Sequence, residues 1–321
     1  MRNSAFINFF RRQLALFSLG RKSRFEITAP SEKEQTLAND ARQRLINLDP
    51  LECTTSMSQS EKEWVENRIV LRSLIMYSDL RYFLKWNMIR HTMFASEASY
   101  TSKEIARLKK EGVSMDELTE DSAGFPDPLL LYPESSSNLV HHKYHLLKYD
   151  SGLEGGIEGS PFILEFGGGY GSFCRLIRRN GHKGQYVIFD LPEFSILQRY
   201  FLEMIDVAVL EPKDYSADKP GVYLVSDEGQ LRSILKGKPE QSTFVGAWSI
   251  SETSIEFRNR FLDLIGDFSD YFIGYQSQFN EVNNVEYFDR WAETKSGIEW
   301  IRLPLDHLPA NVYFFGHRTR A

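Results

Sequence analysis

The stretch FILEFGGGYGSFCRLIRR, residues 162–179, decides the fold prediction because its character changes twice along its length. The run 162–166 is typical of a short apolar strand, and the glycine cluster 167–171 predicts a sharp turn. Residues 173–179 then have helical spacing and end at an Asn-Gly pair. A strand, a glycine turn and a helix predict a βαβ unit, in which a ligand binds beyond the carboxyl end of the strand.

The remainder of the second half repeats this alternation. Helices are expected at 193–204 and 254–266, between apolar runs that predict strands at 186–189, 222–225, 243–248, 271–276, 300–303 and 312–315. Strands that alternate with helices predict an α/β fold with a doubly wound, mostly parallel, Rossmann-like sheet.

The first half has helical patterns instead. Ser31 with Glu34, and Thr101 with Glu104, match capping boxes for helices that reach about residues 48 and 110. Helix-like apolar spacing extends over 61–95, and a further helix is expected at about 138–149. We therefore expect a helical N-terminal portion, residues 1–150, serving as a lid or acceptor platform. The Gly-rich stretch 151–160 predicts the boundary to a second domain, 151–321.

Composition excludes several classes of protein. The chain of 321 residues is 42% hydrophobic and 26% charged, as in ordinary globular proteins, and no apolar run approaches the length of a membrane span. Two distant cysteines, Cys53 and Cys174, favour a reducing cytoplasm. Residues 1–25 carry six basic and no acidic side chains, so the remainder is about −12 (−6 minus +6). This argues against a nucleic-acid partner and leaves residues 1–25 as a peripheral membrane contact or a helix docked on the protein itself.

The spacing of the glycine loop indicates which ligand it binds. A dinucleotide fingerprint counted from Gly167 requires a third glycine where Ser172 stands. The chain has Glu-x-Gly-x-Gly-x-Gly instead, and Asp190 closes the strand 186–189, nineteen residues after Gly171. A carboxylate at that point can accept hydrogen bonds from both hydroxyls of a ribose, and Leu191 would flank the base.

This pattern resembles the first motif of class I S-adenosylmethionine-dependent methyltransferases. The resemblance implies S-adenosylmethionine as cofactor, with Glu165 near its cationic amino-acid end. It also implies that the backbone of Gly167, Gly169 and Gly171 lines the cavity. Tyr170 and Trp248 are assigned to the same pocket.

A closer resemblance is to bacterial sugar O-methyltransferases. It rests on the glycine loop, on YVIFDLPEFSILQRYFL at 186–202, on WSISE at 248–252 and on the preceding helical segment SNLVHHKYH at 137–145. It covers roughly 135–280. It implies methylation of a sugar hydroxyl on a nucleotide, lipid or glycan carrier, in cell-surface polysaccharide synthesis at the cytoplasmic side of the membrane.

A sugar hydroxyl is a weak acid, so a base or a metal should assist the reaction. Glu252 is the first candidate base because it follows strand 243–248 at the carboxyl edge; the alternative is that it only favours the start of a helix capped by Ser251 or Thr253. His141 and His142 are further candidates, and the spacing of His141 and His145 would also suit a metal. Two histidines make an incomplete metal site, so no metal ligands are assigned, although a divalent ion stays open. The alternative is a polar helix face, with at most one side toward the cleft.

Two further groups have weaker patterns. A polar cluster after strand 271–276 would bind sugar hydroxyls or a divalent ion, or form a solvated loop; it comprises Asn280, Glu281, Asn283 and Asn284. An aromatic set would stack on a sugar ring or belong to the core; it comprises Trp64, Tyr77, Tyr82 and Trp86. The alternatives for the whole chain are a phenol or polyketide O-methyltransferase, a nicotinamide oxidoreductase and a non-catalytic scaffold. The sequence does not indicate the oligomeric state.

Overall fold

The structure is a computed structural model that describes residues 28–52, 54, 57–93, 100–129, 132–151 and 156–319. The predictions for residues 1–25 lie outside the described residues. Among the helices that are described, none is long and apolar enough to cross a membrane.

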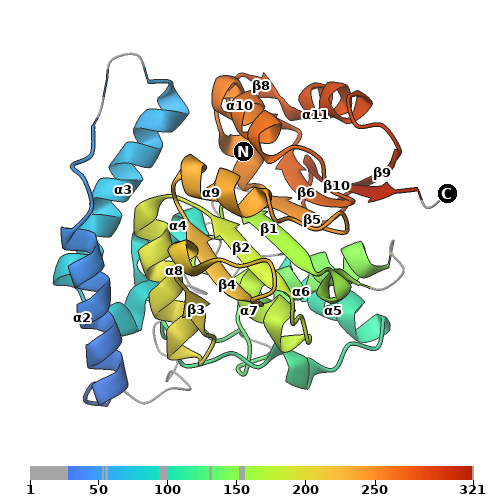
Figure 1. The fold of residues 1–321 in the computed structure, drawn as a ribbon. Coiled ribbons are helices and arrows are strands. Elements are labelled where there is room, and N and C mark those ends of the chain that lie inside the picture. Colours follow the sequence, from blue (N-terminus) through green and yellow to red (C-terminus); the bar gives the residue numbers. More distant parts are fainter. Residues whose placement is uncertain are drawn as a thin grey trace, which may run out of the picture.

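A sheet of eight strands forms the centre of the molecule, in the order β3-β4-β2-β1-β5-β6-β10-β9 (Figure 1). The strands are β1 Phe162–Phe166, β2 Gln185–Phe189, β3 Val209–Leu210, β4 Gly221–Val225, β5 Thr243–Ala247, β6 Asp270–Gln276, β9 Ile298–Pro304 and β10 Asn311–Arg318. Neighbouring strands are parallel from β3 to β6, and β10 is antiparallel to both β6 and β9. The predicted doubly wound, mostly parallel sheet is therefore confirmed.

The order of the strands fixes where a ligand can enter. The chain builds β1, β2 and β4 toward one edge and then returns to add β5 and β6 on the other side of β1. The reversal between β1 and β5 separates their following loops and leaves a crevice at the carboxyl ends of the strands. The predicted glycine loop follows β1 and thus lies beside this crevice.

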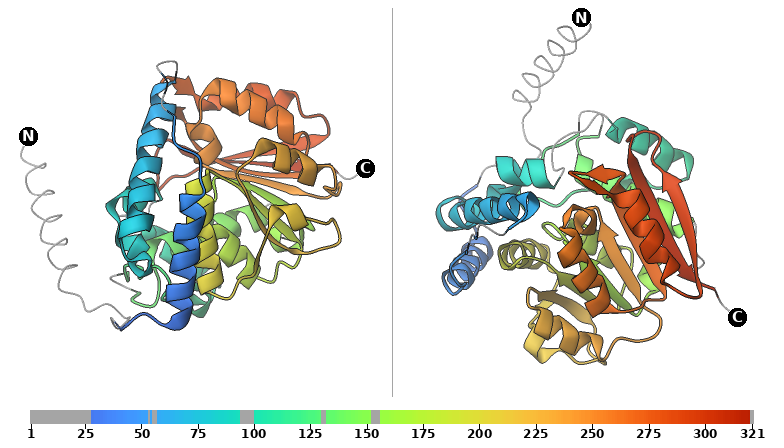
Figure 2. Two further views of the ribbon diagram at one scale, coloured as in Figure 1. Left: turned by 60° about the vertical axis from the view of Figure 1, so that its left-hand side comes forward. Right: turned by 90° about the horizontal axis from the view of Figure 1, so that it is seen from above.

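Helices cover both faces of the sheet (Figures 1 and 2). One face carries α6 Ser137–Asp150, α7 Ser172–Arg179 and α8 Pro192–Met204, with α5 Thr101–Lys110 packed on α6; the other carries α9 Glu228–Leu235, α10 Ile255–Ile265 and α11 Asn284–Glu293. Successive residues of β1 alternate between the two cores: Ile163 packs with α6 to α8, and Leu164 with α9 to α11. A strand buried on both faces has a continuous apolar sequence, which is why β1 was recognisable.

The predicted 61–95 helix is three separate helices. The first, α3 Gln59–Tyr77, begins at a capping box formed by Ser58 and Glu61. It ends because Ser78 is extended, and Asp79 then accepts the amide of Arg81 to start the short helix η1 Leu80–Lys85. The third, α4 Asn87–Thr92, follows at once. The other predicted capping box, Ser31 with Glu34, is confirmed at the start of α2 Glu32–Ile46.

Helix α3 packs beside α8 (Figure 2), and a buried carboxylate joins the two helices. Glu193, on α8, is 0% exposed and accepts from both Arg68 and Arg72 of α3 at 2.7 Å each. Its charge is compensated by two guanidinium groups, as a buried carboxylate requires. Helices α2 to α6 share one hydrophobic core with this face of the sheet. The division of the chain into residues 1–150 and 151–321 stays a prediction.

The predicted capping box at Thr101 is wrong, although the bounds of α5 are close to those expected. The cap residue is Tyr100, which makes no side-chain capping bond. The Thr101 hydroxyl lies 2.9 Å from that of Ser137, and Glu104 turns inward to two histidines. Thr101 and Glu104 have the spacing of a capping box, but both side chains bind partners from other segments instead.

Candidate functional site

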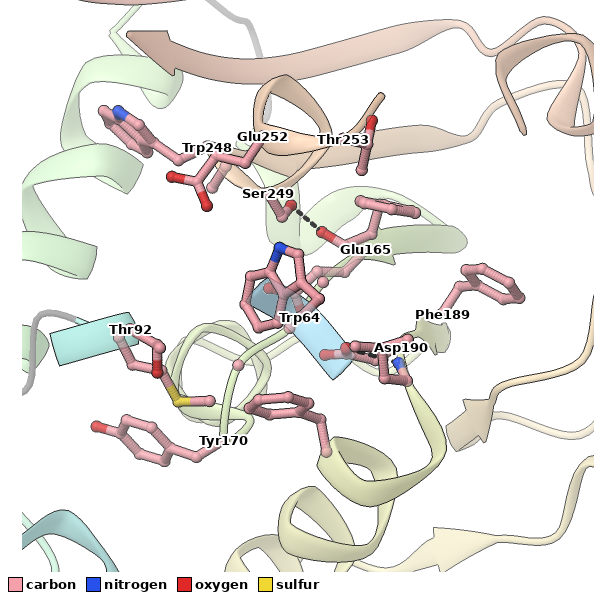
Figure 3. A pocket seen from close by; sticks show the side chains of 18 of the residues that line it. Trp64, Thr92, Glu165, Tyr170, Phe189, Asp190, Trp248, Ser249, Glu252 and Thr253 are labelled. Atoms are coloured by element: carbon pink, nitrogen blue, oxygen red, sulfur yellow. Dashed lines mark hydrogen bonds between the residues drawn. The ribbon is translucent and has the colours of Figure 1, made fainter. Parts of the chain in front are cut away.

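A cavity of about 610 Å³ lies at the carboxyl ends of the parallel strands (Figure 3). Its floor comes from the loops after β1, β2, β4 and β5 and from the end of β6, the region where doubly wound sheets bind ligands. Helix α3 contributes Ser60, Glu61, Trp64, Val65 and Arg68 to the opposite wall. Helix α3 thus forms part of the cavity wall, and the role of the N-terminal helices as a lid or acceptor platform stays a prediction.

The glycine loop has the compressed shape that the sequence predicts. Gly167 has φ 69°, and a Cβ there would lie 2.4 Å from the Cβ of Ser249, in the loop after β5. The Ser249 hydroxyl donates to the carbonyl of Phe166, which holds the two loops together. Gly167 and Gly169 line the cavity, whereas Gly171, with φ 95°, caps α7 and is not among the lining residues. Its role is conformational rather than the predicted direct contact.

Glu165 is a buried carboxyl group in the wall of the cavity. It is 4% exposed and accepts a hydrogen bond of 2.9 Å from the hydroxyl of Tyr186. Burial raises the pKa of Glu165 to about 8, and the nearby Asp190 charge adds to that effect. No basic side chain pairs with Glu165 in the described part of the chain. A cation that entered the cavity would therefore favour its ionised form.

Asp190 lies at the end of β2, where the sequence placed it. Its two oxygens accept from the Leu191 amide and from Nε2 of Gln198, each at 2.7 Å. Burial raises the pKa of Asp190 to about 7, although these hydrogen bonds act to lower it. The cap residue of α8 is Leu191 and forms no side-chain capping bond, so Asp190 is not the helix cap that its Leu-Pro context would also allow. Leu191 lines the cavity beside it.

Trp248 forms the wall at the end of β5 and has strained backbone geometry. Its φ is 65° and its ψ −37°, a region that a bulky residue seldom occupies. The indole Nε1 donates to Oδ1 of Asn311 at 2.6 Å, and the ring stacks on His145 with centroids 4.9 Å apart. A Cβ on Gly274 would lie 2.7 Å from the indole, so β6 must carry glycine beneath it. Such strain is typical of functional sites.

Glu252 belongs to the short helix η5 Ser249–Glu252, before α10 begins. Ser254 caps α10, not Ser251 or Thr253, so Glu252 does not belong to the first turn of that helix. Its carboxylate points into the cavity (Figure 3). Removal from water raises the pKa of Glu252 to about 7, and no charged group is among the causes.

All three histidines of α6 line the cavity, so the expectation that at most one side of the helix faces the cleft is wrong. Nδ1 of His141 lies 2.7 Å from Oε1 of Glu104, and Nδ1 of His145 lies 2.6 Å from the hydroxyl of Tyr313. Burial, with the charges of His141 and Arg175, keeps the pKa of His142 well below its usual value. His142 is therefore a neutral imidazole at physiological pH.

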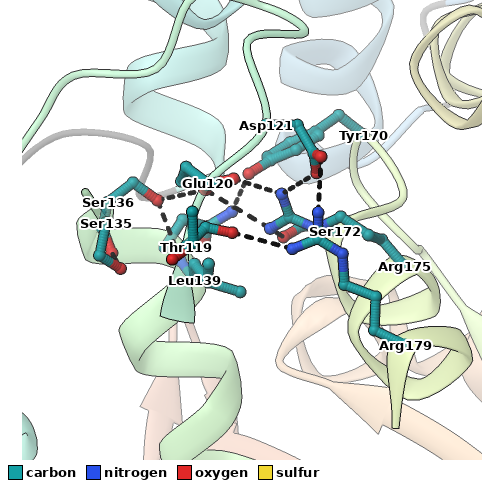
Figure 4. A network of polar contacts seen from close by, with 11 residues as sticks. Thr119, Glu120, Asp121, Ser135, Ser136, Leu139, Tyr170, Ser172, Arg175 and Arg179 are labelled. Carbon is teal, nitrogen blue, oxygen red and sulfur yellow. Dashed lines mark hydrogen bonds and ion pairs between the residues drawn. The ribbon is translucent and has the colours of Figure 1, made fainter. Parts of the chain in front are cut away.

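A buried ion-pair network holds α6 and α7 together (Figure 4). Arg175 of α7, 1% exposed, donates to the carboxylate of Glu120 in the segment before α6. The same carboxylate accepts from the hydroxyl of Ser136 at 2.5 Å, and Ser136 in turn caps α6 by accepting the amide of Leu139. The network thus fixes the start of the helix that carries the three histidines. Tyr170, which lines the cavity, is held by Asn138 of the same helix at 2.8 Å.

The two weaker predictions fail for most of their residues. Asn283 caps α11, and Asn284 is fully buried between Arg258 and the carbonyl of Gln276. Of the four aromatic residues assigned either to a sugar platform or to the core, Trp64 lines the cavity and Trp86 belongs to the core. Tyr77 is 86% exposed on the outer side of the molecule.

Sequence reasoning missed several cavity residues that come from distant segments. They are Met57, Thr92, Met93, Tyr100, Asn138, Gln276, Leu308 and Asn311. Apart from Asn138, which lies in the segment 137–145, none belongs to a motif, so no local signal marked them. Within the described residues, no group of three His, Cys, Asp or Glu side chains is arranged to hold a metal ion.

Neither protein-family models nor curated proteins match this chain. Several solved structures do match this chain. A Podospora anserina methyltransferase with bound SAH is 8% identical, with 84% of this chain and 100% of that chain covered and a TM-score of 0.37. The magnesium protoporphyrin IX methyltransferase of Synechocystis with bound SAM is also 8% identical, with 83% and 100% covered and a TM-score of 0.37. The mitomycin 7-O-methyltransferase MmcR is 14% identical, with 78% and 72% covered and a TM-score of 0.35. The solved structures that this chain resembles are thus methyltransferases with various substrates.

Proposed function

We propose that the cavity binds S-adenosylmethionine and that the protein transfers its methyl group to a hydroxyl of a sugar. The observation that carries the proposal is the pair of buried carboxyl groups, Glu165 and Asp190, on either side of the glycine loop. Both have raised pKa values, and neither is paired with a basic side chain in the described residues. A cationic nucleoside supplies the missing positive charge at one end and ribose hydroxyls at the other.

The charges that line the cavity favour this ligand over a dinucleotide. Its acidic side chains are Glu61, Glu165, Asp190, Glu228 and Glu252. Among the described lining residues the one lysine or arginine is Arg68, and Glu193 already holds its guanidinium. A pyrophosphate would face these carboxylates without a cation, whereas an ammonium or sulfonium group is attracted to them. Gly167 and Gly168 are crowded positions where a side chain would collide with its neighbours: a Cβ at Gly168 would lie 2.7 Å from Ile188.

When bound, the cofactor supplies a methyl group that its positively charged sulfur has already activated. The remaining work of the protein is to hold the acceptor hydroxyl in line and to remove its proton. Glu252 is the leading base because it points into the cavity and titrates near neutral pH. His141 is the second candidate, because Glu104 occupies its Nδ1 and leaves Nε2 for a substrate.

Trp64, Tyr100 and Trp248 give the cavity aromatic walls, which suit a ring-shaped acceptor. The resemblance to sugar O-methyltransferases favours a sugar on a nucleotide, lipid or glycan carrier, used by a cytoplasmic enzyme of cell-surface polysaccharide synthesis. The same walls would also accept a phenol, which loses its proton more easily. A phenol acceptor is therefore the second candidate.

Transfer of a labelled methyl group to a panel of acceptors tests the proposal. The panel contains nucleotide-linked sugars, lipid-linked sugars, glycans and phenols. We expect label on a sugar, and a large loss of turnover with unchanged cofactor affinity in Glu252→Gln. Glu256→Gln, an exposed carboxyl group in the first turn of α10, is the matched control and should keep full activity. Label on phenols alone would overturn the sugar assignment, and cofactor binding without turnover on any acceptor would favour a non-catalytic scaffold.

A further inference from the structure

A buried carboxylate behind the cavity is shared by two histidines. Glu104, on α5, is 0% exposed. Its Oε1 lies 2.7 Å from Nδ1 of His141 and 2.9 Å from Nε2 of His307, which belongs to the loop before β10. Oε2 is buried and has no hydrogen-bond partner. Three segments that are far apart in the sequence thus meet at one oxygen atom.

The protonation of His307 follows from its other partner. Arg107 remains a cation and can only donate. Its Nη1 lies 2.9 Å from Nδ1 of His307 and donates to the hydroxyl of Tyr144 at 2.7 Å. Nδ1 of His307 must therefore accept, which places the proton on Nε2, where it is donated to Glu104. His307 cannot gain a second proton without losing the Arg107 bond.

The protonation of His141 follows in turn. Burial acts to raise the pKa of Glu104, but the hydrogen bonds that its carboxylate accepts from His141 and His307 act in the opposite direction, and the pKa is lowered. Glu104 is then an anion that can only accept, and Nδ1 of His141 must donate to it. The lone pair of the neutral ring is left on Nε2.

We propose that Glu104, oriented by His307 and Arg107, is a positioning residue that holds His141 as an Nε2 base toward the acceptor side of the cavity. The role of His141 as a base rests on the proposed methyl transfer, whereas its tautomer follows from the contacts of Glu104 alone. A purely structural cluster would need only to join α5 to the loop before β10. It would not require that His307 and His141 each adopt one defined tautomer.

Other titratable groups surround His141 and set the background against which Glu104 acts. They are Tyr100, His142, Tyr144, His145, Asp306, His307, Tyr313, Arg107 and Arg175. His142 and His145 are kept neutral by burial, and burial raises the pKa values of Tyr100 and Tyr313. Among these groups Glu104 is therefore the anion in direct contact with His141.

Nitrogen NMR of the full chain with labelled histidine tests the proposal without any acceptor. Two-bond proton–nitrogen spectra give the tautomer and the titration midpoint of each ring, and His141→Asn and His307→Asn assign the signals. We expect the Nδ1–H tautomer for neutral His141 and the Nε2–H tautomer for His307. In Glu104→Gln the share of the Nδ1–H tautomer of His141 should fall, because a neutral amide oxygen accepts that hydrogen bond more weakly than a carboxylate does.

Glu117→Gln is the matched control, because Glu117 is an exposed carboxylate that accepts from Lys143 of α6 at 2.7 Å. It should leave the tautomer of His141 unchanged. An Nε2–H tautomer at His141, or an unchanged share of the Nδ1–H tautomer in Glu104→Gln, would overturn the proposal. Should Glu104→Gln not fold, the tautomers of the unchanged protein and of Arg107→Gln decide, since the latter should release His307 to a mixture of tautomers. Calorimetry with S-adenosylmethionine on the same samples distinguishes the two proposals: absence of binding would defeat the proposed function and leave the tautomer result intact.

Discussion

Replacement of Glu165 by glutamine should make the ligand-free protein more stable at alkaline pH while it weakens cofactor binding. The carboxyl group is 4% exposed, and burial raises its pKa to about 8. Because the folded-state pKa is above the ordinary value of 4.5, the folded protein holds this proton more tightly than the unfolded chain does. The resulting stability is fully present below pH 4.5 and is lost as the pH rises through about 8.

The magnitude follows from the width of that window. Each pH unit is worth about 1.4 kcal/mol, so ionisation of Glu165 costs up to roughly 5 kcal/mol at pH 9. A glutamine cannot ionise, and its carbonyl can still accept the Tyr186 hydroxyl that now donates to Glu165. The variant should therefore match the natural protein near pH 5 and exceed its stability by a few kcal/mol at pH 9. Loss of a charged partner should weaken cofactor binding by about 1.5–3 kcal/mol.

Urea unfolding at pH 5 and pH 9, followed by calorimetry with S-adenosylmethionine, measures both effects. Glu256→Gln, which removes an exposed carboxyl group, is the control and should change neither quantity. Parallel loss of stability in the natural protein and in Glu165→Gln between the two pH values would show that Glu165 does not carry the buried charge. Unchanged cofactor affinity in the variant would remove Glu165 from the binding site.

Three further changes have defined outcomes. Asp190→Ala should weaken cofactor binding by about 1–3 kcal/mol, through loss of a charged hydrogen-bond acceptor, and calorimetry that finds the same affinity would exclude Asp190 from the site. Glu120→Gln leaves the buried Arg175 with Asp121, at 3.3 Å, as its remaining anionic partner and should destabilise the fold by up to about 3–5 kcal/mol in urea unfolding; a loss within error would mean that the network of Figure 4 contributes little. Deletion of residues 1–25 should abolish sedimentation with anionic vesicles, and a full-length protein that never sediments with them would refute the membrane contact.

The elements of the sheet were predictable because their signals are local. The bounds of β1 and β2 agree with the sequence to within one residue, since strands buried on both faces are continuously apolar. The glycine cluster indicated the loop after β1, and the Asp-Leu-Pro sequence indicated the start of α8. Short elements without such signals were missed, namely β3, α9, α11 and the hairpin of β7 Gln278–Phe279 and β8 Val282–Asn283.

The parts of the site that failed depend on contacts between distant segments. Glu104 has the spacing of a capping residue, but the fold brings it to His141 and His307, 37 and 203 residues away. The break after Tyr77 was hidden because the apolar spacing continues across Ser78 into the next helix. Periodicity likewise could not tell Trp64, which faces the cavity, from Trp86, which is buried in the core.

A crystal structure of the full chain grown with S-adenosylhomocysteine tests the central claim most directly. The account predicts the nucleoside in the cavity at the carboxyl ends of β1 and β2. Its ribose hydroxyls should lie within hydrogen-bond distance of Asp190, and its amino-acid end beside the glycine loop and Glu165. A nucleoside bound elsewhere, or in the cavity with both carboxyl groups turned away from it, would contradict the account.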